Sequence, residues 1–354
     1  NLHERDNNTE HDLGNKNAIK SILQMTHTES PEKISRKDFM LTELNVLRTY
    51  LRLFVAPVNQ NVDYDYPKAR SLTELNTLAS LLLLLSILGC AFFLLKKHPL
   101  LAFGIFWFFL TVSVEALVAQ EEFIFEHRMY LPMVGLSLFL VAGVSCFLKT
   151  PKQLNIVVLA IAAVFSFMTW QRNFVWKDEF TLMSDNVLKS PNKGRSYYNR
   201  GNAYQAKGFF DEAMADYNKA IELDPNLAMA YYNRGLAKRE KGDLAGELAD
   251  YDKALELDPM YAQAYYNRGI AREEKGDLDG SISDNTKLIE LDAKNARAYY
   301  NRGIARGQKG DLDGSIADNT MAINLDPKYA QAFYNRALAR AQKGDIQGSI
   351  EDNT

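Results

Sequence analysis

The chain has 354 residues, a formal net charge of −3 and 47% hydrophobic residues. This near-neutral balance, with no basic stripe along the sequence, argues against nucleic acid as a partner. The two cysteines, Cys90 and Cys146, lie inside apolar segments, so we expect no disulfide framework and no metal site.

The amino-terminal residues 1–35 are polar and rich in Asn, Glu, Thr and His, which predicts an extracytoplasmic loop. The first residue is Asn1, and no signal peptide follows it. The last residue, Thr354, stops inside a sequence repeat described below. Both ends therefore indicate a fragment of a longer protein.

Residues 36–77 form the next predicted region, an interfacial helix and an outer loop. Apolar residues recur near helical spacing at Phe39, Leu41, Leu44, Val46, Leu47, Tyr50, Leu51 and Phe54. Charged residues occupy much of the opposite arc, which is typical of a helix that lies in the membrane interface. The alternative is a helix that packs against an upstream domain.

Four apolar segments in residues 78–172 are long enough to cross a bilayer core of about 30 Å. They are Leu78–Leu95, Leu100–Val118, Met129–Leu148 and Asn155–Trp170. A helix in a soluble core rarely stays apolar around its whole circumference for this length. The sequence therefore predicts four transmembrane helices.

The charges of the short connections predict how these spans are oriented. The first connection, Lys96-Lys97-His98, is basic, and the third carries Lys149 and Lys152. The second connection, residues 120–128, is acidic on balance. Because basic short loops stay in the cytoplasm, we expect residues 173–193 to be an extracytoplasmic linker and residues 194–354 to lie outside the cytoplasm. We expect a bacterial inner membrane.

Charged residues near the outer ends of the second and third spans are a candidate site, because charge at membrane depth is costly. The candidates for binding a lipid phosphate or a substrate are Arg128, His127, Glu126, Tyr130 and Glu115. Arg128 and His127 would donate charge-assisted hydrogen bonds to phosphate, and a glutamate would orient the arginine. Ordinary interfacial anchoring by Arg128 and Tyr130 is the alternative.

A period of 34 residues dominates the carboxyl-terminal region. The motif Tyr197-Tyr198-Asn199-Arg200-Gly201 returns at 231–235, 265–269 and 299–303, and in altered form at 333–337. A second glycine recurs at Gly208, Gly242, Gly276, Gly310 and Gly344. Such a period predicts helical hairpins, each too small to bury its apolar face alone, so neighbours must stack into a solenoid.

Two rows of polar residues run along the predicted solenoid. The first row is Asn199, Asn233, Asn267, Asn301 and Asn335, on the first helix of each unit near the concave face. Because an amide offers both a donor and an acceptor, this row would hold an extended peptide backbone. Local hydrogen bonding within the solenoid is the alternative.

The second row pairs an arginine with an aspartate sixteen residues later. It comprises Arg200, Arg234, Arg268, Arg302 and Arg336 with Asp216, Asp250, Asp284, Asp318 and Asp352. We expect contacts between the two within or between repeats, as a structural device. A charged groove for a ligand is the alternative.

The motif and its period are identified as the tetratricopeptide repeat (TPR), with four full repeats and a truncated fifth in residues 194–354. The fold class is therefore all-α: a multispanning transmembrane helix bundle followed by a right-handed TPR superhelix. The resemblance implies that an extended polypeptide or a protein binds the concave face.

The membrane half resembles transmembrane TPR proteins related to protein O-mannosyltransferases. The resemblance rests on Arg52-Leu53-Phe54, Asn61-Val62-Asp63-Tyr64-Asp65, Glu126-His127-Arg128-Met129-Tyr130-Leu131-Pro132 and Arg172-Asn173-Phe174-Val175-Trp176. It implies a glycosyltransferase that uses a polyprenyl-phosphate sugar donor at the outer face. In that family the catalytic acids precede the region covered here, so we assign no catalytic residue and no cofactor to this chain and expect it to be inactive alone.

Two functions are therefore compared. The first is the acceptor-binding, lipid-facing part of a membrane glycosyltransferase. The second is a non-enzymatic envelope scaffold that assembles proteins through its repeats.

Overall fold

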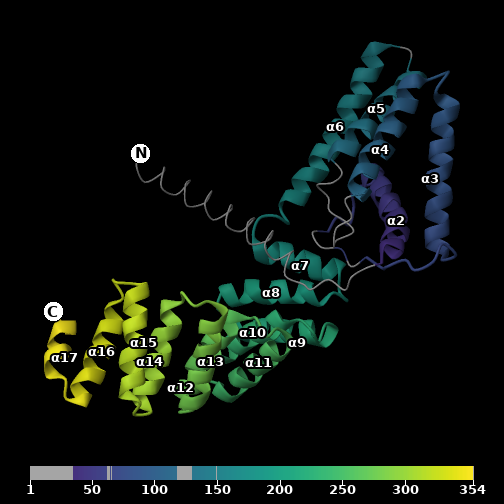
Figure 1. The fold of residues 1–354 in the computed structure, drawn as a ribbon. Coiled ribbons are helices and arrows are strands. Elements are labelled where there is room, and N and C mark those ends of the chain that lie inside the picture. Colours follow the sequence, from purple (N-terminus) through teal and green to yellow (C-terminus); the bar gives the residue numbers. More distant parts are fainter. Residues whose placement is uncertain (1–34, 62–63, 65, 118–129, 149, 354) are drawn as a thin grey trace, which may run out of the picture. The chain divides into compact units, whose positions relative to one another are not determined.

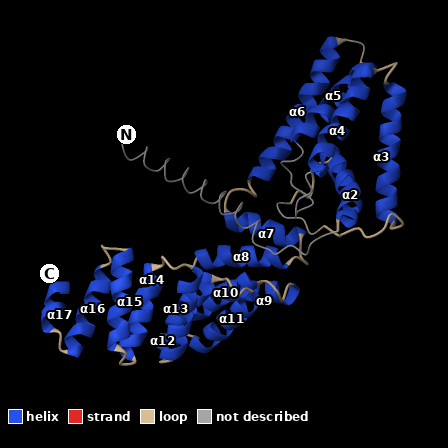
Figure 2. Ribbon diagram, viewed as in Figure 1, coloured by secondary structure: helices blue, strands red, loops and turns tan. Residues whose placement is uncertain are grey.

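The computed structural model describes residues 35–61, 64, 66–117, 130–148 and 150–353. Every regular element among these residues is a helix (Figures 1 and 2), which confirms the all-α prediction for the described part. The chain divides into two compact units, Asn1–Asn192 and Lys193–Thr354. We call them the amino-terminal unit and the solenoid, and each is described by itself.

The described helices of the amino-terminal unit follow one another along the chain, labelled in Figure 1. They are α2 (Arg36–Val55), α3 (Leu75–Leu94), α4 (Pro99–Leu117), α5 (Tyr130–Phe147), α6 (Pro151–Asn173) and α7 (Glu179–Lys189). The four predicted spans correspond to α3 to α6.

Helix α2 begins at a side-chain cap, because the Ser35 hydroxyl accepts a hydrogen bond from the backbone N–H of Asp38. Its buried residues Val46, Tyr50 and Leu53 form one cluster with residues of α4 and α5, namely Phe108, Val112 and Leu136. The apolar face predicted to lie in the membrane interface is thus packed against protein. The difference arises because periodicity shows that a face is apolar but does not show what covers it.

A buried polar contact joins α2 to α3. The Asn45 amide donates to the Thr77 hydroxyl at 3.0 Å, and the Ser80 hydroxyl donates to the Asn45 oxygen at 2.7 Å. All three side chains are buried. Because each of these groups has a partner, the contact avoids the cost of burying an unsatisfied polar group.

Helices α4 and α5 approach each other through glycine. A Cβ atom built on Gly104 would lie 2.5 Å from the Gly135 carbonyl oxygen, and one built on Gly135 would lie 2.6 Å from the Gly104 oxygen. The indole N–H of Trp107 donates to the Leu131 carbonyl at 3.0 Å. This spacing leaves no room for any side chain at either glycine, so the two backbones pack directly.

Two of the described helices, α3 and α6, are long and apolar enough to cross a membrane. The apolar stretches described in α4 and α5 are shorter, Pro99–Ser113 and Leu131–Phe147. Helix α6 has no buried residue, and several of its large apolar side chains, among them Ile156, Leu159 and Trp170, are exposed.

The predicted linker 173–193 contains a helix that the sequence interpretation missed. Asp178 caps α7 by accepting from the backbone N–H of Thr181, and the Asp185 carboxylate binds Arg172 and Lys189, each at 2.7 Å. The signal was present, because an acidic cap precedes a short amphipathic segment.

The solenoid consists of helical hairpins, in which a first helix, A, is followed by a second, B. The A helices are α8 (Gly194–Ala206), α10 (Ala228–Glu240), α12 (Ala262–Glu274), α14 (Ala296–Gln308) and α16 (Ala330–Lys343). The B helices are α9 (Phe210–Leu223), α11 (Leu244–Leu257), α13 (Leu278–Leu291), α15 (Leu312–Leu325) and α17 (Ile346–Asn353).

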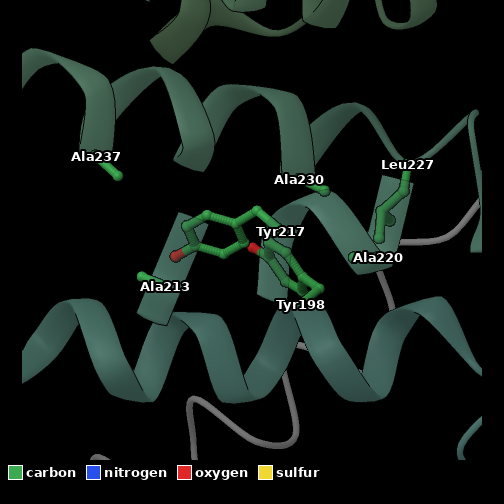
Figure 3. Packing of buried hydrophobic residues seen from close by; sticks show 7 residues of the cluster. All are labelled: Tyr198, Ala213, Tyr217, Ala220, Leu227, Ala230 and Ala237. Carbon is green, nitrogen blue, oxygen red and sulfur yellow. The ribbon is translucent and has the colours of Figure 1, made fainter. Parts of the chain in front are cut away.

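Small residues hold the helices of the first repeats close together. A Cβ atom on Gly201 would meet the Tyr217 ring at 2.7 Å, so the glycine makes room for a fully buried tyrosine. Tyr198 and Tyr217 lie next to one another among alanines of the same cluster (Figure 3). The turn between helices needs the second glycine, since Gly208 has φ = +79°, which favours glycine.

Repeats three and four fill the space between helices A and B with a different residue. Asn285 and Asn319 stand where the first two repeats have Tyr217 and Tyr251, and both are fully buried. Each amide nitrogen donates to the carbonyl of the serine four residues earlier, at 2.9 Å. The hairpin therefore recurs every 34 residues, but the residue buried between its two helices can be either aromatic or polar.

Candidate polypeptide-binding face

The structure brings the predicted arginine and aspartate rows together in every repeat. Each arginine donates from Nε and Nη2 to the two oxygens of the aspartate sixteen residues later, at 2.5–3.0 Å. The guanidinium also lies 5.4–5.6 Å from the ring centroid of the aromatic residue three positions before it. This bidentate, stacked arrangement fixes helix A against helix B.

The same arginines bind the preceding repeat. The Nη1 group of Arg234 donates to Asn218 and that of Arg268 donates to Asp252, each at 2.7 Å. Arg302 and Arg336 make the equivalent bonds to threonine hydroxyls at 3.1 Å. Because these donors are engaged within the solenoid, the row acts as a staple between repeats and leaves little capacity for a ligand.

From the second repeat onward, a second cation forms an ion pair with the same aspartate. Lys238 binds Asp250 at 2.8 Å, and Arg272 binds Asp284 at 2.9 Å. Arg306 and Arg340 repeat the contact at 2.8 and 3.0 Å. These aspartates are almost fully buried, so two cations per carboxylate offset the cost of removing it from water.

The asparagine row lies at the contact between neighbouring A helices. The Asn233 amide donates to the Tyr198 hydroxyl at 3.2 Å and to the Asn202 oxygen at 2.7 Å. The Asn267 amide donates to the Tyr232 hydroxyl at 2.8 Å. Asn199 and Asn301 are buried, and Asn335 is half-buried. The hydrogen bonds of Asn233 and Asn267 therefore orient tyrosines of the preceding repeat, and a direct role of the row in holding a peptide stays a prediction.

A row of aromatic and aliphatic side chains lies on the solvent-facing side of the A helices in repeats two to five, which we call their outer arc. The alanines on the inner arc, such as Ala264 and Ala271 of α12, have no exposed surface. On the outer arc a tyrosine is followed four residues later by leucine or isoleucine, which places both on one face. We call this row the Tyr–aliphatic stripe; it comprises Tyr232, Leu236, Tyr266, Ile270, Tyr300, Ile304, Tyr334 and Leu338.

The side chains of the stripe are partly exposed but held in place. Tyr334 is 63% exposed and Leu338 48%, and the other six are half-buried. The ring centroid of Tyr232 lies 4.8 Å from that of Tyr261, and the ring centroid of Tyr300 lies 4.9 Å from that of Tyr329. Sequence reasoning missed this stripe, although the tyrosine and the aliphatic residue recur in repeats two to five.

Charges gather where α10 and α12 end. Arg239 binds Glu247 at 3.3 Å and Glu274 of the next repeat at 2.6 Å. Glu273 accepts from the Gln308 amide at 2.7 Å, and burial raises the pKa of its carboxyl group. Burial also raises the pKa of Glu247, which is 1% exposed.

The predicted lipid-phosphate site cannot be placed. Glu126, His127 and Arg128 lie outside the described residues, and nothing is described of the side chains of Glu115 and Tyr130. The site stays a prediction. Within the described ranges, no group of three or more His, Cys, Asp or Glu residues could hold a metal ion.

Stacked helical hairpins that display a regular outer face define a helical-repeat protein. The TPR family models match residues 201–242, 236–276 and 262–295. The chain therefore contains tetratricopeptide repeats, as its sequence period predicted. These matches lie within the solenoid, and comparison with curated proteins found no match. The resemblance of the membrane half to O-mannosyltransferase-related proteins is not supported by them.

Solved structures are similar to part of the chain. YrrB, described as a TPR protein with an unusual peptide-binding site, is 23% identical, with a TM-score of 0.45 over 48% of this chain and 88% of YrrB. MamA is 26% identical, with a TM-score of 0.44 over 45% and 87%. The first TPR of Spaghetti (RPAP3), bound to an HSP90 peptide, is 27% identical, with a TM-score of 0.32 over 33% and 96%.

Proposed function

We propose that the chain is a membrane-anchored TPR protein that binds a polypeptide partner along the Tyr–aliphatic stripe. The observation that carries this proposal is the stripe itself, a tyrosine and an aliphatic residue on the outer arc of four successive A helices. Aromatic anchors surrounded by aliphatic surface are the side chains that contribute most to protein interfaces.

The rigidity of the stripe supports binding. The Tyr232 hydroxyl accepts a hydrogen bond from Asn267 of the next repeat, and the arginines of repeats two to five fix their A helices to the B helix of the preceding repeat as well as to their own. A surface whose side chains are ordered before binding loses less conformational entropy when a partner arrives. Asn267 thus contributes to the site by positioning Tyr232, and the arginine row contributes by holding the repeats in register.

The exposure of α6 supports membrane anchoring. Ile156, Leu159 and Trp170 are each more than half exposed on a 23-residue apolar helix. An apolar helix in a soluble core buries such side chains, whereas in a bilayer they contact lipid. The basic connection Lys96-Lys97-His98 favours an orientation that places the solenoid outside the cytoplasm.

Sugar transfer forms no part of this proposal. The motif at residues 126–132 that implied it lies mostly outside the described residues. The proposal is therefore a binding scaffold in a membrane, with lipids around its apolar helices and a polypeptide along the solenoid.

The binding part is tested with a displayed library of short random peptides and the full chain in lipid nanodiscs. We expect peptides that bind the wild type and lose about tenfold or more in affinity on the variant Tyr266→Ala with Ile270→Ala, a change of about 1.4 kcal/mol or more. The control Lys287→Ala, on the exposed surface of α13, is expected to leave affinity unchanged. Absence of binders, or binders indifferent to the stripe variant, would refute stripe-mediated binding.

The anchoring part is tested by washing membranes with alkaline carbonate. We expect the chain to stay in the membrane pellet, because apolar spans are not released by loss of electrostatic contacts. Release of the intact chain into the supernatant would show that it is not an integral membrane protein.

A further inference from the structure

We infer that the polypeptide partner carries basic residues beside its apolar ones, and that Glu240, Glu273 and Glu274 receive them. This inference rests on the proposed function, because the carboxylates extend the Tyr–aliphatic stripe. Glu240 follows Leu236 by four residues, and Glu274 follows Ile270 by four. Tyrosine, aliphatic residue and carboxylate therefore succeed one another along one face of α10 and of α12.

The charge is confined to the second and third repeats. At the position that Glu240 and Glu274 occupy, the fourth and fifth repeats have Gln308 and Gln342, and the first has Ala206. The stripe thus has an acidic stretch beside α10 and α12 and a neutral stretch beside α14 and α16. A partner that follows the stripe meets negative charge over only part of its length.

Near the carboxyl-terminal ends of α10 and α12, carboxylates outnumber the cations that contact them. Arg239 is shared between Glu247 and Glu274, while the described partner of the Glu273 carboxylate is the neutral Gln308 amide. The neighbouring lysine that follows α10, Lys241, turns away and binds Asp211 of the preceding repeat. The described contacts therefore leave Glu240 and Glu273 without a cationic partner.

The position of these groups on their helices strengthens the negative potential. Glu240 and Glu274 are the last residues of α10 and α12, where the helix dipole places its negative end. Glutamates are unfavourable there, and a cation is favourable. A lysine or arginine of the partner would interact with the carboxylates and with the helix ends at once.

Partial burial makes the absence of a cation costly at Glu273. Its carboxyl group is half-buried, and burial, rather than a nearby charge, is the main cause that raises its pKa. A carboxylate partly removed from water gains more from an ion pair than a fully exposed one. A basic group of the partner would supply that pair, and its apolar neighbours would cover Tyr266 and Ile270.

The test compares the charge of the selected peptides with the effect of neutral glutamate variants. From the random library bound to the full chain in nanodiscs, we expect stripe-dependent binders to be enriched in lysine and arginine. One such basic peptide is then titrated against wild type, the double variant Glu240→Gln with Glu273→Gln, and the control Glu290→Gln on α13. We expect the double variant to bind about tenfold more weakly at low salt, and the difference to shrink as salt rises.

The outcomes separate this inference from the proposed function. Stripe-dependent binders that are acidic or neutral, or a double variant that binds as tightly as wild type, would overturn the basic partner and leave the binding scaffold intact. Loss of binding in Glu290→Gln equal to that in the double variant would also overturn it, because the effect would then be general electrostatics. A library that yields no stripe-dependent binder refutes both.

Discussion

The amino-terminal unit and the solenoid are both built from helices, but their helices are held together by different contacts. In the amino-terminal unit, α4 and α5 meet where two glycine backbones touch, and α2 is joined to α3 by one buried amide and two hydroxyls. In the solenoid, the same ion pairs, alanines and glycines recur with each repeat.

The proposed membrane anchoring of the amino-terminal unit would account for this difference. Lipid provides no hydrophobic force that drives apolar helices together, so close packing of small residues and internal hydrogen bonds must hold them. In water, buried alanines contribute apolar burial, and partly exposed ion pairs fix the register of the helices. Three substitutions test this comparison, from the largest expected effect to the smallest.

The glycine contact of the amino-terminal unit is expected to be the most sensitive point. In Gly104→Ala the new Cβ would lie 2.5 Å from the Gly135 carbonyl oxygen, so α4 and α5 must move apart. We expect a loss of about 3 kcal/mol in stability, typical of severe overpacking. Thermal unfolding of the purified full chain in detergent measures it.

Gly89→Ala is the matched control, because no atom outside its own helix lies within 4 Å of the built Cβ. Alanine is the better helix former, so this variant is expected to be neutral or more stable by up to about 1 kcal/mol. Equal losses in both variants would mean that the close approach of α4 and α5 does not hold the unit together.

The ion-pair row of the solenoid is expected to come second. Asp284→Ala leaves Arg268 and Arg272 without the buried carboxylate that accepts from both. We expect a loss of about 2 kcal/mol, below the usual cost of breaking a buried pair because the guanidinium groups can reach water. Hydrogen exchange of α12 and α13 in the full chain reports it. Asp279→Ala, on the same helix but 76% exposed, is expected to cost less than about 0.5 kcal/mol. A cost as large as that of Asp284→Ala would contradict the buried-carboxylate explanation.

The smallest expected effect concerns an ion pair that is present between three pairs of neighbouring repeats and absent between the second and third repeats. Lysines at the end of three A helices bind an aspartate thirty residues earlier, in Lys241–Asp211, Lys309–Asp279 and Lys343–Asp313. Opposite Lys275 the same position is Ala245. We expect Ala245→Asp to stabilise this joint by about 0.5 kcal/mol at low salt. Hydrogen exchange measures the gain, and Ala245→Asn separates it from helix capping. A gain of the same size with asparagine would show that the ion pair contributes nothing.

Much of the solenoid could be predicted from the sequence because its determinants are local and repeated. Gly201 lets helix B approach helix A, and the glycine at the turn marks where each hairpin bends. The sixteen-residue spacing indicated which arginine would face which aspartate. The stripe was not predicted because its tyrosines also belong to the repeat motif, and the motif does not show which of its side chains stay exposed.

The amino-terminal unit was less predictable. Apolar length located α3 to α6, but periodicity did not reveal that the apolar face of α2 is covered by α4 and α5, nor that residues 179–189 form α7. These features depend on contacts between segments far apart in the chain, such as Val46 with Phe108, for which no local pattern exists.

The sequence by itself determined the helical repeats, their period and the apolar helices, because backbone preferences and the spacing of apolar residues act over a few turns. Only the tertiary structure decided which polar side chains form bonds between helices and repeats and which stay exposed to solvent. That difference depends on burial and on competition between partners: the arginines and the amides of Asn233 and Asn267 are engaged, while Tyr334, Leu338 and Glu240 are left exposed. The proposed site therefore consists of side chains that the packing of the repeats leaves at least partly exposed.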